Sequence, residues 1–111
     1  MINSRNKGNS YERKIMNQIK IFFPMVKTAR NESKTLDDSK VDLAFTNPFN
    51  LQLKAVEAMS INKVIEVLNS MPNNQNINTI IYKKNNKPEL VIMYKDSLYK
   101  ILSWLKESGK I

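Results

Sequence analysis

Residues 41–57, which read VDLAFTNPFNLQLKAVE, predict two short β-strands joined by a turn at Asn47-Pro48. An Asn-Pro pair favours a turn, and proline cannot donate a hydrogen bond to a neighbouring strand. The rest of the chain can be arranged around this hairpin, because helical and strand patterns precede and follow it.

The second strand of the hairpin should divide its side chains between two faces. Since side chains alternate along a strand, Leu51 and Leu53 are expected on one face and Gln52 and Lys54 on the other. The amide and the ammonium would then project together toward Asp42 on the first strand. A carboxylate, an amide oxygen and a lysine at one strand edge could hold a hard cation and a water molecule. A surface hairpin with an exposed aspartate and lysine is the alternative interpretation.

Composition indicates one basic globular domain. The chain has 111 residues, of which 41% are hydrophobic, and its 18 Lys and Arg against 10 Asp and Glu give a net charge of +8. So high a charge favours a polyanionic partner, with nucleic acid ahead of a membrane surface. The absence of cysteine and histidine excludes disulfides, thiolate or imidazole metal sites and a histidine base. Catalysis would have to use carboxylates, lysine, tyrosine or a metal ion.

We expect neither a leader nor a membrane span. Residues 1–14 contain no apolar segment, and the longest apolar run, 21–26, is interrupted by Pro24. We therefore expect a cytoplasmic, intracellular protein that does not enter a membrane.

The first helix is expected to begin at a cap on Ser10 or Asn9 and to end at Pro24. Residues 1–9 would then be a flexible basic arm in front of a domain over residues 10–111. Glu12 would lie in the first turn, where its simplest role is to interact with the helix dipole.

Outside the hairpin and the first helix, the pattern predicts three more strands and two more helices. The expected strands are 25–30, 77–82 and 90–94, and the expected helices are 60–70 and 97–107, the last capped by Asp96. The residues expected to face the core are Ile61, Val64, Ile65 and Leu68 on the first of these helices, and Leu98, Ile101, Leu102 and Leu105 on the second. The element order predicts a single α/β domain with a mixed central β-sheet flanked by helices.

Three segments resemble the PD-(D/E)XK nuclease superfamily, and within it the small Holliday junction resolvases of the archaeal and phage type. Residues 7–13, KGNSYER, resemble the opening of the resolvase first helix, where a Glu follows a Gly and an aromatic residue. Asp42 followed ten residues later by Gln52-Leu53-Lys54 resembles the D…(E/Q)xK core. Residues 79–88, TIIYKKNNKP, resemble the lysine-rich hairpin before the final strand of phage members.

The resemblance implies a restriction endonuclease-like fold of order α-β-β-β-α-β-β-α and a homodimer that cleaves branched DNA with Mg²⁺, for which Mn²⁺ can substitute. Asp42 and Gln52 would bind the metal, with the backbone carbonyl of Leu53 as a third ligand. Lys54 would orient or deprotonate the attacking water and stabilise charge on the phosphate. Glu12 would complete the site, either on a second metal or through water. A virus or phage would be a natural source of such an enzyme.

The same resemblance, together with the positive charge, indicates which residues contact DNA. The basic residues expected to do so are Arg5, Lys7, Arg13, Arg30, Lys34, Lys83, Lys84 and Lys87. The dimer would use the last helix, where Tyr99 and Trp104 are displaced from the inward stripe.

Gln52 is a departure from the family pattern, because a Glu is usual at that position. The change removes one negative charge from the metal site, and it keeps open a non-catalytic nucleic-acid-binding module with the nuclease fold. A third interpretation is a basic structural or interaction protein in which Asp42 and Lys54 pair on the surface.

Overall fold

The computed structural model of the chain describes residues 4–29 and 40–111, with residues 4–7 described by their backbone alone. Its elements are α1 (Ser4–Ile19), β1 (Lys27–Thr28), β2 (Leu43–Ala44), β3 (Phe49–Ala55), α4 (Ile61–Ser70), β4 (Ile77–Lys83), β5 (Leu90–Ile92) and α5 (Lys95–Glu107). This order agrees with the predicted sequence of helices and strands. None of the helices within these residues is long and apolar enough to cross a membrane.

A parallel pair of strands forms the centre of the fold. β3 runs parallel to β4, with Gln52 opposite Ile80, and β5 runs antiparallel to β4, with Ile92 opposite Ile80. Parallel neighbours need a crossover connection, which α4 supplies. The resulting three-stranded mixed sheet confirms the predicted α/β class.

The predicted single sheet is divided, because β2 pairs with β1 and not with β3. The Asp42 N–H donates to the Leu51 carbonyl at 2.8 Å, and the Asp42 carboxylate accepts the Leu53 N–H at 2.6 Å. The Leu53 N–H is therefore paired with the Asp42 side chain and not with a backbone carbonyl of a neighbouring strand. Phe45 adopts a φ of 63°, a left-handed conformation that a bulky residue rarely takes, and β2 ends just before it.

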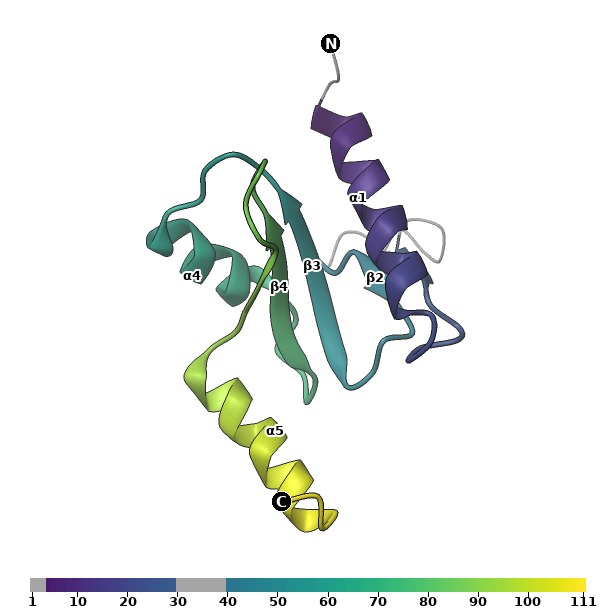
Figure 1. Cartoon of the computed structure of the whole chain (residues 1–111). Helices are drawn as coiled ribbons and strands as arrows, with labels where there is room; N and C mark the ends of the chain where they lie inside the picture. The colour runs from purple at the N-terminus through teal and green to yellow at the C-terminus, as the bar shows by residue number, and fades with distance from the viewer. Residues whose placement is uncertain (1–3, 30–39) are drawn as a thin grey trace.

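The two faces of β3 and β4 are covered by different helices, which lie on opposite sides of the strands (Figure 1). α1 packs on the face that carries Leu51 and Leu53, and α4 packs on the face that carries Ile80. The predicted division of the β3 side chains is confirmed, because Gln52 and Lys54 line a cavity on the α4 side.

The start of α1 was predicted wrongly. The helix begins at Ser4 and not after a cap at Ser10, so residues 4–9 belong to it and not to an arm. Residues 4–9 contain no proline, and nothing in them stops the helix from extending toward the N-terminus. Glu12 consequently lies in the third turn, too far from the helix start for the expected dipole interaction.

α4 has the predicted length but a rotated face. Ser60 caps it, with its hydroxyl accepting the Lys63 N–H at 3.1 Å. Its buried residues are Val64, Val67 and Leu68. Ile61 and Ile65, both expected in the core, are 73% and 41% exposed. The helix therefore turns a neighbouring stripe toward Ile80, and α4 contributes polar residues to the edge of the same face.

α5 does not pack inward as predicted. None of its residues is buried, and Leu98 and Leu102 are 45% and 40% exposed. Tyr94 takes the cap position that had been assigned to Asp96, which lies in the first turn. Figure 1 shows the helix extending away from the sheet, whose faces already carry α1 and α4. Polar contacts hold it, including a bond from Lys100 Nζ to the Gln75 carbonyl at 2.6 Å.

Tyr11 ties α1 to the segment that precedes β5. Its ring is buried, and its hydroxyl donates to Glu89 Oε2 at 2.7 Å, while Lys14 Nζ donates to Glu89 Oε1 at 3.3 Å. Burial and the bond to Glu89 raise the pKa of Tyr11. The bond from Tyr11, with smaller contributions from Lys14 and Lys83, lowers the pKa of Glu89.

Glu89→Gln should reduce stability at neutral pH by an amount that disappears in acid. Since the folded state lowers the pKa of Glu89, the stabilisation is complete above the ordinary value of about 4.3 and is lost as the pH falls through the folded value. Melting temperatures of wild type and variant, measured from neutral pH to about pH 2, should therefore converge. Glu107→Gln on exposed α5 is the matched control. A gap that stays constant over this range would contradict the assignment.

Candidate functional site

A cavity of about 210 Å³ lies between β3 and α4. Gln52 and Lys54 line it from the strand, on one face as predicted, but Asp42, toward which they were expected to project, is not among its lining residues. Its other lining residues are Lys40, Lys63, Glu66, Val67 and Ser70.

Gln52 presents a buried oxygen that has no hydrogen-bond partner within residues 4–29 and 40–111. The residue is only 8% exposed. Leaving a buried amide oxygen unpaired costs on the order of 1–3 kcal/mol, so such atoms are uncommon unless something else binds them. One residue that lines the cavity thus carries a buried amide oxygen without a partner among the described residues.

Asp42 lies next to this strand and not on the cavity wall. Its carboxylate accepts the Leu53 N–H, which fixes the side chain at the edge of β3. The N–H and C=O of one strand residue point to the same side, so the Leu53 carbonyl faces the same edge as Asp42. The structure thus brings together Asp42, the Leu53 backbone, Gln52 and Lys54 along a short length of β3.

Glu12 is not brought into this arrangement. It lies half-buried on α1, which packs on the Leu51 face of β3, and it is not among the residues that line the cavity. In the described part of the chain no three acidic residues gather as a group that could hold a metal ion.

The cavity carries more positive than negative charge. Three lysines line it against one carboxylate, and Lys63 Nζ lies 3.1 Å from Glu66 Oε1. Lys40, which lies two residues before Asp42 in sequence, also has a φ of 65°, a backbone conformation that is unfavourable for a lysine. This arrangement suits a ligand with a negatively charged group.

Sequence reasoning missed the contribution of α4 to this cavity. Lys63, Glu66 and Ser70 recur at spacings of three and four, which is a polar stripe on one face of a helix. That spacing was the available signal. Lys40 also lines the cavity and lies two residues before Asp42 in sequence, but no role was predicted for it.

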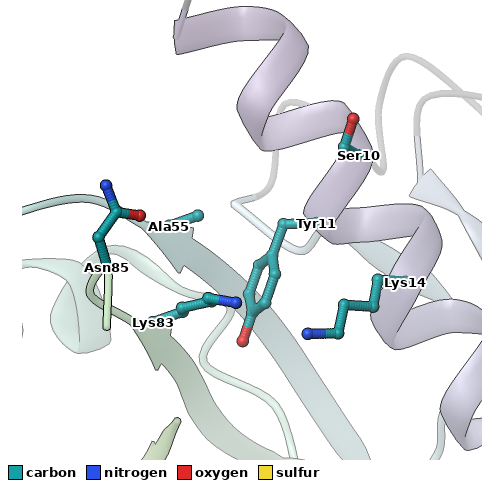
Figure 2. Close-up of a pocket in the computed structure, with 6 residues that line it drawn as sticks. All are labelled: Ser10, Tyr11, Lys14, Ala55, Lys83 and Asn85. Carbon is teal, nitrogen blue, oxygen red and sulfur yellow. The ribbon is translucent and has the colours of Figure 1, made fainter. Parts of the chain in front are cut away.

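A second cavity, of about 240 Å³, lies on the α1 side of the sheet. Figure 2 shows the ammonium groups of Lys14 and Lys83 on either side of the Tyr11 hydroxyl. Ser10, Ala55 and Asn85 complete its lining. Because Ala55 and Lys83 end β3 and β4, this cavity lies at the carboxyl end of the parallel pair.

The residues predicted to contact DNA are only partly described. Arg13, Lys84 and Lys87 are exposed, and Lys83 is half-buried at the second cavity. The side chains of Arg5 and Lys7, and all of Arg30 and Lys34, lie outside the described residues.

No family model matches the chain, and neither does any curated protein or solved structure. The features of the chain that bear on its function are therefore the two cavities, the residues beside Asp42 and the net charge of +8.

Proposed function

We propose that this protein is a metal-dependent DNA endonuclease with a restriction endonuclease-like fold, acting on branched DNA as Holliday junction resolvases do. One observation carries the proposal. Gln52, whose buried amide oxygen has no partner among the described residues, lines a cavity together with Lys54, and the residue between them, Leu53, donates its N–H to the Asp42 carboxylate. These residues are the D…QxK set that resembles the nuclease superfamily.

The donor atoms at this edge fit a hard divalent cation. An amide oxygen, a carboxylate and a backbone carbonyl are the oxygen ligands that Mg²⁺ and Mn²⁺ accept. Gln52, Asp42 and the Leu53 carbonyl would hold the ion, and the unpaired Gln52 oxygen supports this choice. A bound Mg²⁺ supplies Lewis-acid polarisation of the phosphoryl oxygen and a means of activating water.

The lysines of the cavity supply the other requirement of phosphodiester hydrolysis, which is stabilisation of negative charge. Lys54 would orient the attacking water and interact with the scissile phosphate. Lys40 and Lys63 line the same cavity and would add positive charge around that phosphate. A role for Glu12, through a second metal or through water, is supported by the family resemblance. The position of Glu12 on α1 does not support it.

A non-catalytic nucleic-acid-binding module is the second candidate, and the neutral Gln52 favours it. With one fewer negative ligand and three lysines around it, the cavity would bind a phosphate group more readily than a cation. The two candidates differ in whether DNA is cut.

Asp42→Asn should abolish cleavage while leaving the fold intact. Asparagine keeps an oxygen that can accept the Leu53 N–H, so the strand contact survives, but the negative charge at the proposed metal site is lost. A labelled four-way junction incubated with Mg²⁺ should be cut by wild type and not by the variant, and chelator should stop the reaction. An uncut junction that is nevertheless bound by wild type would favour the second candidate.

Gln52→Glu should tighten Mg²⁺ binding by roughly tenfold or more, as expected for a change in the ligand shell. The three cavity lysines would compensate the new charge, so the buried glutamate should be tolerated. Titration calorimetry with Mg²⁺ measures the effect, and Gln18→Glu on the exposed side of α1 makes the same chemical change away from the cavity. Equal or weaker binding by Gln52→Glu would remove Gln52 from the ligand set.

The resolvase form of the proposal also requires a homodimer, since two symmetric strands must be cut. The exposed apolar side of α5 supports this, although its residues were expected in the core. Sedimentation at micromolar concentration should show a dimer that Leu98→Ser weakens, with Ser103→Ala on the same helix as control. A monomer both with and without junction DNA would leave a simple nuclease and exclude the resolvase.

A further inference from the structure

We propose that Tyr11, Lys14 and Lys83 form a binding site for a backbone phosphate of nucleic acid, and that the Glu89 carboxylate occupies this phosphate site in the free protein. The inference rests on the nucleic-acid-binding part of the proposed function and not on cleavage. It concerns the second cavity, which lies on the opposite face of the sheet from Gln52.

The contacts of Glu89 define an anion site. Its two oxygens accept separate bonds, one from the Tyr11 hydroxyl at 2.7 Å and one from Lys14 Nζ at 3.3 Å. Lys83 stabilises the same carboxylate electrostatically. A hydroxyl and two ammonium groups around one anion are also the donors that proteins use to bind phosphate oxygens.

The site has room and donors beyond those that Glu89 uses. The cavity beside Tyr11 measures about 240 Å³, and Ser10 and Asn85 add a hydroxyl and an amide to its lining (Figure 2). The four polar side chains drawn around Tyr11 come from α1, from the end of β4 and from the turn that follows it. The two ammonium groups that lie near the Tyr11 hydroxyl therefore come from different elements, Lys14 from α1 and Lys83 from the end of β4.

Glu89 is able to leave. It follows Pro88 in the exposed connection between β4 and β5, and its side chain is about one-third exposed. Exposed ion pairs contribute little free energy and are readily exchanged. A backbone phosphodiester carries the same single negative charge as Glu89, so replacing the carboxylate with a phosphate leaves the charge balance with the two lysines unchanged.

The position of the second cavity suits a nucleic-acid strand that also reaches the first cavity. Lys54 and Ala55 are consecutive at the end of β3, and they line the first and second cavities respectively. A nucleic acid passing over the carboxyl end of β3 and β4 would meet lysines on both faces of the sheet.

Glu89→Gln tests the proposal because it should act in opposite directions on stability and on binding. It weakens the tie to α1, yet it should raise affinity for a fluorescein-labelled duplex by about two- to fivefold, because a competing anion is removed. The slope of log affinity against log salt should steepen by about 0.9, which corresponds to one more phosphate neutralised. Anisotropy titrations in chelator exclude any contribution from cleavage, so an inactive nuclease leaves the test intact.

Two controls distinguish a specific effect at the phosphate site from a general effect of net charge on DNA affinity. Glu107→Gln removes the same charge from exposed α5. In wild type it should leave the slope of log affinity against log salt unchanged, and it should not produce the pH-dependent loss of stability expected for Glu89→Gln. In the Glu89→Gln background, Lys83→Gln should cost more affinity than it does in wild type, whereas Lys110→Gln should cost the same in both. Unchanged or weaker DNA binding by Glu89→Gln, or an equal gain from Glu107→Gln, would overturn the proposal.

Discussion

The bond between the Asp42 carboxylate and the Leu53 N–H is the contact on which the rest of the arrangement depends. It joins the small β1–β2 pair to the three-stranded sheet at a place where backbone pairing has stopped. A carboxylate accepting a backbone N–H is a charge-assisted bond, stronger than the neutral bond it replaces. The same contact sets Asp42 against the strand that carries Gln52 and Lys54, so the fold and the candidate site share one interaction.

The polar face of β3 shows why Gln52 is informative. Asn50 lies two residues earlier on the same face and is also buried, but it donates to Asn78 Oδ1 at 2.8 Å and accepts a bond from Asn76. The fold can therefore satisfy a buried amide on this strand. The Gln52 oxygen has no partner among the described residues, which lowers the stability of the folded protein. Gln52 lines a cavity that three lysines also line.

Local patterns predicted the elements whose signals agree with one another. The alternation of Leu51, Gln52, Leu53 and Lys54 gave the correct faces of β3, because the strand period is a property of a short segment. The helix predicted over 60–70 agrees with α4 to within one residue. Local patterns also drew attention to Gln52 and Lys54, which share a cavity. The restriction endonuclease-like fold and the nuclease chemistry stay predictions of the family resemblance.

Errors arose where neighbours, and not local sequence, decide the outcome. Ser10 has the chemistry of a cap, but a helix begins there only if the preceding residues are not helical, and those of α1 are. Ile61 and Ile65 are as apolar as Val67, so only the packing against Ile80 distinguishes them. The placement of Glu12 and the shared lining by Lys40 and Lys63 depend on elements far apart in sequence, which a linear pattern does not encode.

The weak attachment of α5 has a consequence for the dynamics of the protein. Its 13 residues are close to the length at which an isolated helix is marginal in water, and none is buried to hold it. Its order depends on the bond from Lys100 to Gln75, on the Tyr94 hydroxyl contact with Asn69, and on local stacking of Lys100 over Trp104. The helix should therefore unfold and refold as a separate cooperative unit, with amide hydrogens that exchange far faster than those of β3 and β4.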